Sequence, residues 1–171
     1  PNHTLPGHLN AVGSLSQALG KEVRLGHVGQ KTLYRAGATH DLGKVDPVVN
    51  YIVEKPRKLT TDEKDPTGIH AELTALSLKI VRAETALQIV GRGHHERING
   101  EGYPSQLSGR GVDNYTRVVT VADLVDAMTD KRPGRIPKTL AETISELRRW
   151  QMDRALDDDV VNAFLRMCDR S

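Results

Sequence analysis

Histidines at the expected ends of helices are the first feature of the sequence that suggests chemistry. Five of the seven histidines in the chain are placed at the start or end of an expected helix: His8, His40, His70, His94 and His95. Asp41 directly follows His40. Neutral imidazoles and carboxylates together suit borderline transition metals such as Fe, Mn, Ni or Zn. These six ligands are too many for one tetrahedral site, so the pattern predicts two adjacent metal ions that share a carboxylate.

Two further carboxylates lie in an apolar segment. Asp123 and Asp126 are three residues apart on one face of the stretch RVVTVADLVDAM, which we expect to be a buried helix. A buried carboxylate costs on the order of several kcal/mol unless a positive partner meets it. An arginine is the ordinary partner. For Asp123 we favour a metal ion, whereas Asp126 is expected to be a structural carboxylate paired with a basic residue.

The elements that must position these residues are all helical. The 171 residues are 37% apolar but only 4% aromatic, which favours one compact domain of packed helices with an aliphatic core. Apolar periodicity and end signals predict a helix over residues 9–19, ended by Gly20, and another over 28–40, ended by Gly43. They predict further helices over 71–94 (two helices meeting near 82–85), 117–129, 139–149 and 158–167. Pro66 and Gly68 are expected to interrupt a helix that starts near Thr60 or Thr61.

Charge and cysteine content exclude several classes of protein. The net charge is +2, from 24 basic and 22 acidic residues, so no nucleic-acid surface is expected. Cys168 is the only cysteine and cannot form an intramolecular disulfide, which favours a cytoplasmic location. No apolar stretch has the length of a membrane span. We expect residues 1–171 to be a single domain, cut from a longer signalling protein.

The order of the motifs resembles a known family. HDLGK, IVEKPRKLT, a lone histidine, HHERINGEGYP and RVVTVADLVDAMTDKRPGR follow one another as in the HD-GYP domains of the HD phosphohydrolase superfamily. The resemblance covers the chain from His8 to about Met167. It implies a bacterial, all-helical domain of the HD type, which hydrolyses cyclic di-GMP to pGpG and then GMP through a metal-bridged hydroxide. The metals implied are two divalent ions, Fe or Mn, with Zn, Ni, Mg or Ca as alternatives.

The same resemblance assigns roles to individual residues. One metal ion would be held by His8, His40, Asp41 and Asp123, and the other by Asp41, His70, His94 and His95. Asp41 and Lys44 would be catalytic. Substrate contacts would come from Lys44, Arg132, Arg135, Gly102, Tyr103 and Pro104. Tyr103 has two open interpretations, as an anchor that holds its loop and as a contact for ligand or partner. Glu96 is expected to orient a ligand histidine.

Departures from the family pattern leave alternatives open. Thr4 stands where three-metal members carry a glutamate, so two ions are expected instead of three. The interruption at Pro66 and Gly68 would leave His70 poorly fixed, while Asn99 and Gly134 also differ from the usual residues. The alternatives are a degenerate module that binds a cyclic dinucleotide or a signalling protein without turnover, and an enzyme for another nucleotide. We call the segment around Gly102, Tyr103 and Pro104 the GYP loop, and a diguanylate cyclase or another signalling protein is the partner type expected there. No membrane contact is expected.

Overall fold

The structure is a computed structural model that describes residues 4–47, 61–131 and 136–170. This part of the chain contains seven α-helices: α1 (Leu5–Glu22), α2 (His27–Thr39), α4 (Thr61–Ile80), α5 (Thr85–Gly93), α6 (Asn114–Thr129), α7 (Leu140–Met152) and α8 (Asp158–Cys168). Two short 3-10 turns, η1 (Leu42–Val45) and η2 (Gly109–Gly111), complete it. The described ranges hold no strand, only one isolated bridge between Asn99 and Ser108. The predicted all-α class is therefore confirmed.

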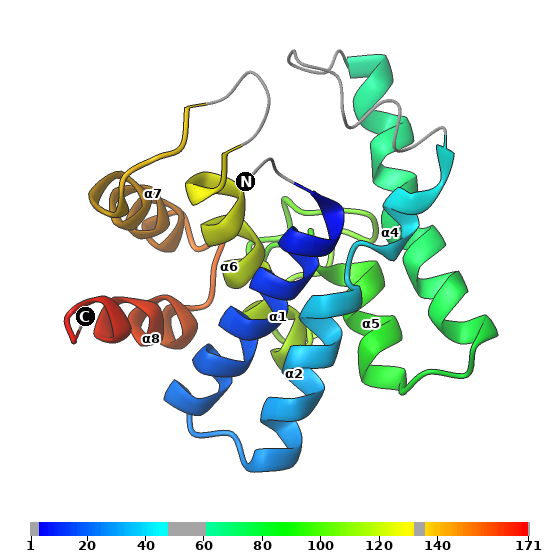
Figure 1. Cartoon of the computed structure of the whole chain (residues 1–171). Coiled ribbons are helices and arrows are strands. Elements are labelled where there is room, and N and C mark those ends of the chain that lie inside the picture. The colour runs from blue at the N-terminus through cyan, green and yellow to red at the C-terminus, as the bar shows by residue number, and fades with distance from the viewer. Residues whose placement is uncertain (1–3, 48–60, 132–135, 171) are drawn as a thin grey trace.

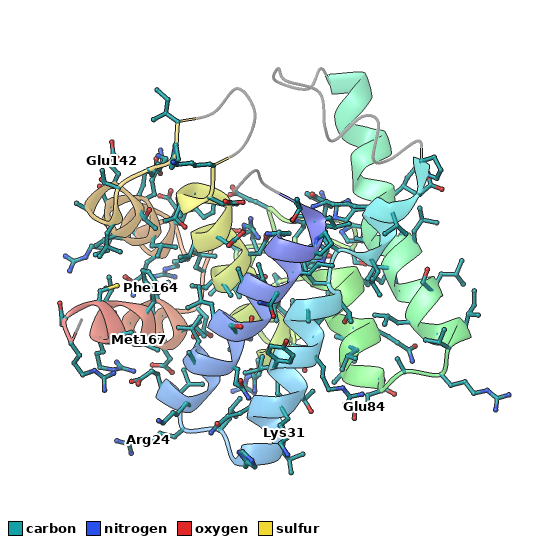
Figure 2. The ribbon with its side chains drawn as sticks, in the orientation of Figure 1. Arg24, Lys31, Glu84, Glu142, Phe164 and Met167 are labelled. Carbon is teal, nitrogen blue, oxygen red and sulfur yellow. The ribbon has the colours of Figure 1, made fainter. Side chains whose placement is uncertain are left out.

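Helices α1, α2 and α6 form the centre of the molecule. In Figure 1, α4 and α5 lie on one side of this centre and α7 and α8 on the other. The core is aliphatic, as its low aromatic content predicts, and Val12, Leu33 and Val119 are fully buried in it. Phe164, the only phenylalanine, lies between α7 and α8 in Figure 2 and is 6% exposed. Within the described residues, no helix combines the length and the apolar character that crossing a bilayer requires.

The first helix is longer at both ends than the sequence indicates. Its N-terminus is Leu5, because the hydroxyl of Thr4 accepts a hydrogen bond from the amide of Gly7 at 3.3 Å and so caps the first turn. The prediction that Gly20 ends the helix is wrong. A side chain at position 20 would collide with Leu33 of α2, so this glycine permits close helix packing instead of a turn.

Helix α4 is continuous where an interruption was expected. It runs from Thr61 to Ile80 through both Pro66 and Gly68. Helices in proteins gain most of their stability from tertiary packing, and α4 contacts both η1 and α5. These contacts outweigh the low local propensity, so the predicted break is wrong, and His70 lies in the interior of a regular helix.

The remaining helices follow the sequence pattern closely. Helix α6 is buried as predicted, with Val119, Val121 and Ala122 at 0% exposure. Helix α7 begins at a capping box, in which Thr139 and Glu142 exchange hydrogen bonds between their side chains and backbones. Because α6 is buried on several sides, it can present carboxylates to the middle of the bundle.

Candidate metal centre

Seven side chains from five helices or their ends converge at one place in the bundle. They are His8 from α1, His40 and Asp41 after α2, His70 from α4, His94 and His95 after α5, and Asp123 from α6. The donor atoms of His8, His40 and Asp41 lie within 4.8 Å of one another, and so do those of Asp41, His70, His94 and His95. Asp123 Oδ1 lies 3.4 Å from His8 Nε2 and 3.7 Å from His40 Nε2. The set of residues predicted as ligands thus meets in space.

The two groups of donors differ in composition. We call His8, His40, Asp41 and Asp123 the acid-rich subsite, and Asp41, His70, His94 and His95 the histidine-rich subsite. Asp41, at 0% exposure, belongs to both. Its Oδ2 lies 3.3 Å from the Nε2 atoms of both His8 and His40, and its Oδ1 lies 3.2 Å and 3.3 Å from those of His70 and His94. Each carboxylate oxygen therefore faces one subsite, as a bridging ligand requires.

The polar atoms of the centre are arranged for a cation rather than for one another. Within the described residues, His40 Nε2 and Asp41 Oδ1 are buried without a hydrogen-bond partner. His70 Nε2 lies 3.2 Å from His94 Nε2 and 3.1 Å from His95 Nε2, so three imidazole nitrogens point at a common position. Buried polar atoms without partners are costly, and a shared cation satisfies all of these donors at once. The residues present fit a pair of divalent metal ions.

The ends of α2 and α5 fix two of the imidazoles in the tautomer that a metal ligand needs. His40 Nδ1 lies 2.7 Å from the carbonyl oxygen of Gly37, and His94 Nδ1 lies 2.9 Å from that of Gly91. A carbonyl oxygen only accepts hydrogen bonds, so Nδ1 carries a proton in both rings. In the neutral ring, the lone pair is therefore on Nε2, the atom that faces the centre.

The segment that carries Asp41 is held against α4 by a glycine. The amide of Gly43 donates a hydrogen bond of 2.7 Å to Thr74 Oγ1, and a side chain at position 43 would collide with the carbonyl group of His70. Only glycine permits this close approach of η1 to α4. The sequence suggested merely that Gly43 ends a helix, and its role in bringing Asp41 to His70 was missed.

Charge is distributed unevenly between the subsites. Burial opposes a charge on His40, but the carboxylates of Asp41 and Asp123 outweigh it and raise the pKa of His40 to about 10. Burial lowers the pKa of His94 to about 4, with repulsion from His40 adding to the effect against the attraction of Asp41. Burial and the neighbouring His94 likewise lower the pKa of His95. Without metal, the environment thus favours a proton on His40 and disfavours one on His94 and His95.

Lys44 lies directly over the shared carboxylate. Its ammonium group forms an ion pair with Asp41 Oδ2, and its side chain is 19% exposed. Lys44 lies in the 3-10 turn η1, which directly follows the ligand candidates His40 and Asp41. A positive charge at the open edge of the centre suits the predicted contact with a phosphate oxygen.

The loop after His95 is held by a buried carboxylate. Glu96 is 2% exposed, and its two oxygens accept hydrogen bonds from the backbone amides of Ser105 at 2.7 Å and Leu107 at 2.9 Å. Both oxygens of Glu96 thus hold the loop. These contacts do not support the expectation that Glu96 orients a ligand histidine. Gly102 is buried in this loop, where a side chain would collide with the backbone of Glu96 and Arg97.

The same loop reaches the histidine-rich subsite. The ring of Tyr103 stacks on His95 with centroids 4.6 Å apart and an angle of 26° between the planes. Tyr103 is 40% exposed, so one part of the ring packs on a ligand and another faces solvent. Pro104 follows it and is half-buried. The interpretation of Tyr103 as an anchor for the loop is compatible with this contact, and its binding of substrate stays a prediction.

Two supporting residues were not recognised as such in the sequence. Asp126 Oδ2 lies 2.6 Å from His8 Nδ1, so the expected structural pairing with a basic residue is a pairing with a ligand histidine. Thr120 donates a hydrogen bond of 2.8 Å to the carbonyl oxygen of His94. The spacing of Asp123 and Asp126 was the available signal for the first residue, and nothing in the sequence indicated the second. The predicted substrate contacts Arg132 and Arg135 lie outside the described residues.

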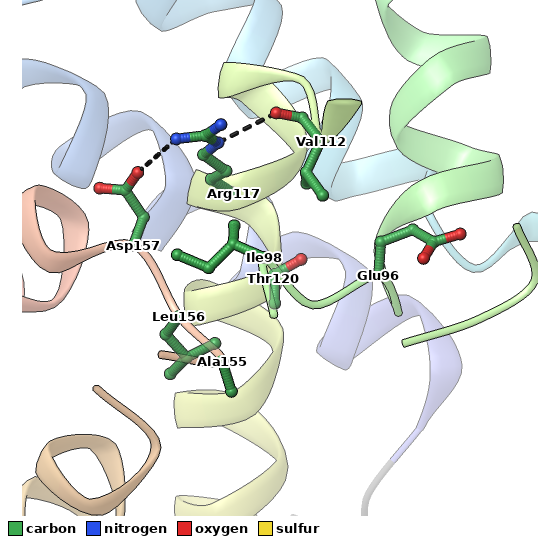
Figure 3. Close-up of a pocket in the computed structure, with 8 residues that line it drawn as sticks. All are labelled: Glu96, Ile98, Val112, Arg117, Thr120, Ala155, Leu156 and Asp157. Carbon is green, nitrogen blue, oxygen red and sulfur yellow. Dashed lines mark hydrogen bonds and ion pairs between the residues drawn. The ribbon is translucent and has the colours of Figure 1, made fainter. Parts of the chain in front are cut away.

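A small pocket behind the loop belongs to this support rather than to the centre. Figure 3 shows its lining, formed by Glu96, Ile98, Val112, Arg117, Thr120, Ala155, Leu156 and Asp157. Arg117 crosses it, donating to Asp157 Oδ2 at 2.8 Å and to the carbonyl oxygen of Val112 at 2.9 Å. None of the seven ligand candidates lines the pocket. Its polar groups are instead engaged in holding the loop to α6 and to the segment before α8.

Comparison with protein families and curated proteins gives a consistent result. The family model of the HD domain matches residues 2–160. The 3'3'-cGAMP-specific phosphodiesterase 1 of Vibrio cholerae is 33% identical over 159 residues, which cover 93% of this chain and 37% of that protein. A cyclic di-GMP phosphodiesterase of Thermotoga maritima is 32% identical over 165 residues, covering 94% of this chain and 44% of that protein. The chain therefore spans less than half the length of these curated relatives.

Solved structures show the same fold at low sequence identity. Bd1817, an HDG"Y"P protein from Bdellovibrio bacteriovorus, superimposes with a TM-score of 0.77 at 16% identity, covering 97% of this chain and 53% of that chain. The HD domain of the Listeria monocytogenes phosphodiesterase PgpH, solved with cyclic-di-AMP, gives a TM-score of 0.67 at 13% identity and covers 93% of this chain and 85% of that chain. The helical architecture that surrounds the seven ligand candidates is thus that of these proteins.

Proposed function

The chain belongs to the HD domain family as an HD-GYP domain, and from that premise we propose that it is a metal-dependent phosphodiesterase for cyclic dinucleotides. We take cyclic di-GMP as its substrate, with pGpG as the first product and GMP as the second. The observation that carries the proposal is the position of Asp41, whose two oxygens face separate groups of imidazoles. A shared carboxylate of this kind supports two adjacent cations.

Two divalent ions, Fe or Mn, would be held in the acid-rich and histidine-rich subsites. When bound, such a pair stabilises negative charge on the attacking and leaving oxygens of a phosphodiester and lowers the pKa of water. The chain contributes the spacing and the orientation. Asp41 sets the relation of the two subsites, while the carbonyl groups of Gly37 and Gly91 keep Nε2 of His40 and His94 in the ligating form.

The charge of the complete centre favours an anionic substrate. Two divalent ions bring four positive charges, and the carboxylates of Asp41, Asp123 and Asp126 bring three negative ones. A surplus of one positive charge remains at the centre, and Lys44 adds a second at its edge. Phosphodiester oxygens would be attracted to this position, and Lys44 would neutralise a non-bridging oxygen as charge develops in the transition state.

The GYP loop would orient the substrate. Burial, with the nearby Asp41 carboxylate, raises the pKa of Tyr103, so its phenol stays protonated and can donate a hydrogen bond to a phosphate or a base. Its stacking on His95 ties this donor to the histidine-rich subsite. Gly102 keeps the loop backbone close to Glu96. Arg132 and Arg135 are assigned to the remaining substrate phosphate by their place in the sequence.

A second substrate is supported by the relatives. Because the curated relatives include a 3'3'-cGAMP-specific enzyme as well as cyclic di-GMP enzymes, cGAMP is the alternative substrate of the same centre. The two molecules share the cyclic backbone with two phosphodiesters and differ in one base. The metal centre would treat them alike, so the discrimination would have to come from contacts with the bases.

The test is anaerobic purification with Fe or Mn, followed by metal analysis and a chromatographic assay of products from both cyclic dinucleotides. We expect about two ions per chain and the appearance of pGpG. His40→Ala and Asp41→Ala are the controls, and equal turnover in all three proteins would identify a contaminating enzyme. A protein that binds cyclic di-GMP but holds no metal and makes no product would instead be the degenerate binding module.

A further inference from the structure

One ligand candidate differs from the others in the partner of its second ring nitrogen. His40 and His94 turn Nδ1 toward neutral backbone carbonyl groups. His8 turns Nδ1 toward the carboxylate of Asp126 at 2.6 Å. This is the shortest of the three Nδ1 contacts, and it joins two side chains from helices that are far apart in the sequence.

Helix α6 holds both nitrogens of the His8 ring. Asp123 and Asp126 lie one turn apart on α6, and the side chain of each is 14% exposed. Asp123 Oδ1 lies 3.4 Å from His8 Nε2, while Asp126 Oδ2 contacts Nδ1 on the other side of the ring. The ring of His8 is 3% exposed, so it has no room to rotate away into solvent. The contact that holds Nδ1 comes from α6, whereas Nε2 faces both Asp123 of α6 and Asp41 after α2.

We propose that Asp126 is a positioning residue for His8, and that this contact makes the acid-rich subsite the tighter of the two for a divalent cation. A carboxylate on Nδ1 keeps the proton there, leaves Nε2 as the ligating atom and increases its basicity more than a neutral carbonyl does. It also places a third carboxylate beside a subsite that already contains Asp41 and Asp123. The histidine-rich subsite has Asp41 alone, so Coulomb attraction for a cation is stronger on the acid-rich side.

The inference rests on the metal centre of the proposed function, and a metal titration separates the two. Metal-free protein is titrated with Mn²⁺, and free Mn²⁺ is measured by its electron paramagnetic resonance signal. The wild-type chain is expected to bind two ions in two steps. Asp126→Asn, which keeps the shape of the side chain but removes its charge, is expected to weaken one step by about 10- to 100-fold and to leave the other unchanged. Asp158→Asn changes the net charge equally at an exposed position in the first turn of α8 and should alter neither step.

A double-mutant cycle shows whether Asp126 acts through His8. In a His8→Ala background, Asp126→Asn is expected to cause less than a threefold further loss of Mn²⁺ affinity, because the ring that it orients is gone. The same 10- to 100-fold loss in both backgrounds would overturn the proposal, and so would an unchanged affinity in the single variant. Circular dichroism of each variant controls for unfolding, and if Asp126→Asn does not fold, Asp126→Glu replaces it with rescue of affinity as the expected result. Failure of the wild-type chain to bind two ions would instead contradict the proposed function.

Discussion

The two halves of the metal centre are built in the same way but carry opposite electrostatic character. Each half receives a histidine from the residue that directly follows a helix, His40 after α2 and His94 after α5. Each ring is oriented by the carbonyl group of a glycine three residues earlier. The carboxylates, however, lie mainly on one side. As a result the pKa of His40 is raised to about 10, whereas that of His94 is lowered to about 4.

This comparison separates what backbone geometry provides from what side-chain charge provides. The C-terminal turn of a helix supplies a carbonyl oxygen at the right place for Nδ1, and that arrangement is repeated without change. The affinity and protonation of each half are then decided by which carboxylates α6 adds, since Asp123 and Asp126 both serve the same half. The shared residue is Asp41, so its loss is expected to have the largest effect.

Replacement of Asp41 with alanine would remove the one ligand common to both subsites. We expect both ions to be lost and kcat/KM to fall by on the order of 1000-fold, since metal stabilisation of the transition state contributes several kcal/mol. Metal content by mass spectrometry and the product assay measure this, with Asp158→Ala at an exposed position of α8 as the control. If Asp41→Ala keeps one tightly bound ion, the two subsites are independent and the carboxylate does not couple them.

Lys44→Ala tests the chemistry at the edge of the centre without removing a ligand. We expect both ions to remain and kcat/KM to fall by about 100-fold, because the ammonium group stabilises charge that develops on the phosphate. Lys31→Ala on the exposed surface of α2 is the matched control (Figure 2). A loss of metal in the Lys44 variant would mean that the lysine serves mainly to hold Asp41.

Gly43→Ala should damage one half more than the other. The added methyl group would collide with the carbonyl group of His70 and push η1 away from α4. We expect the Mn²⁺ affinity of the histidine-rich subsite to fall by about tenfold, with a smaller change at the acid-rich subsite. Gly26→Ala, where an added methyl group meets nothing within 4 Å, is the control. Equal losses at both subsites would show that η1 positions the whole centre.

The pH dependence of stability in the metal-free protein is a separate test of the electrostatic difference. The pKa of His40 rises from 6.5 to about 10 on folding, so its stabilising contribution is complete below 6.5 and is lost as the pH rises toward 10. The pKa of His94 falls from 6.5 to about 4, so stability is lost as the pH falls from 6.5 toward 4. The unfolding temperature with a chelator present should therefore show a maximum near pH 6.5 and decline on either side.

The two limbs of this profile belong to different subsites. His40→Gln should flatten the alkaline limb, and His94→Gln should flatten the acid limb. A profile that keeps both limbs in each variant would assign the titration to other groups. The measurement is differential scanning calorimetry from pH 4 to pH 10 on protein stripped of metal.

Much of the fold was predictable because its signals are local. The buried character of α6 follows from its run of valines, and the end of α7 that carries Thr139 is a local capping box. The failures occurred where tertiary contacts override propensity. At position 20 of α1, Leu33 of α2 occupies the space that a side chain would need, so the glycine serves packing and does not end the helix. Helix α4 continues through Pro66, and it packs against η1 and α5. Neither partner is visible from the neighbouring sequence.

The ligand candidates were also predictable, because residue type and order carry the signal. The residues that hold them in place were not. Asp126 was expected to be structural, Glu96 was assigned to a histidine rather than to its own loop, and Gly43 was interpreted only as the end of a helix. Each role depends on a contact with another part of the fold. Asp126 contacts α1, Glu96 contacts the GYP loop, and Gly43 packs against α4. The sequence therefore identifies side chains that converge in the fold before it identifies the residues that hold them in place.

The distribution of the ligands over five helices has a consequence for the lifetime of the protein. Ions in the two subsites would act as cross-links between α1, α2, α4, α5 and α6. Ions that bind only the folded chain would shift the unfolding equilibrium toward that state, by an amount that grows with the free ion concentration. Removal of the metal should therefore speed digestion by a protease, and resistance to proteolysis would report how fully the two subsites are occupied.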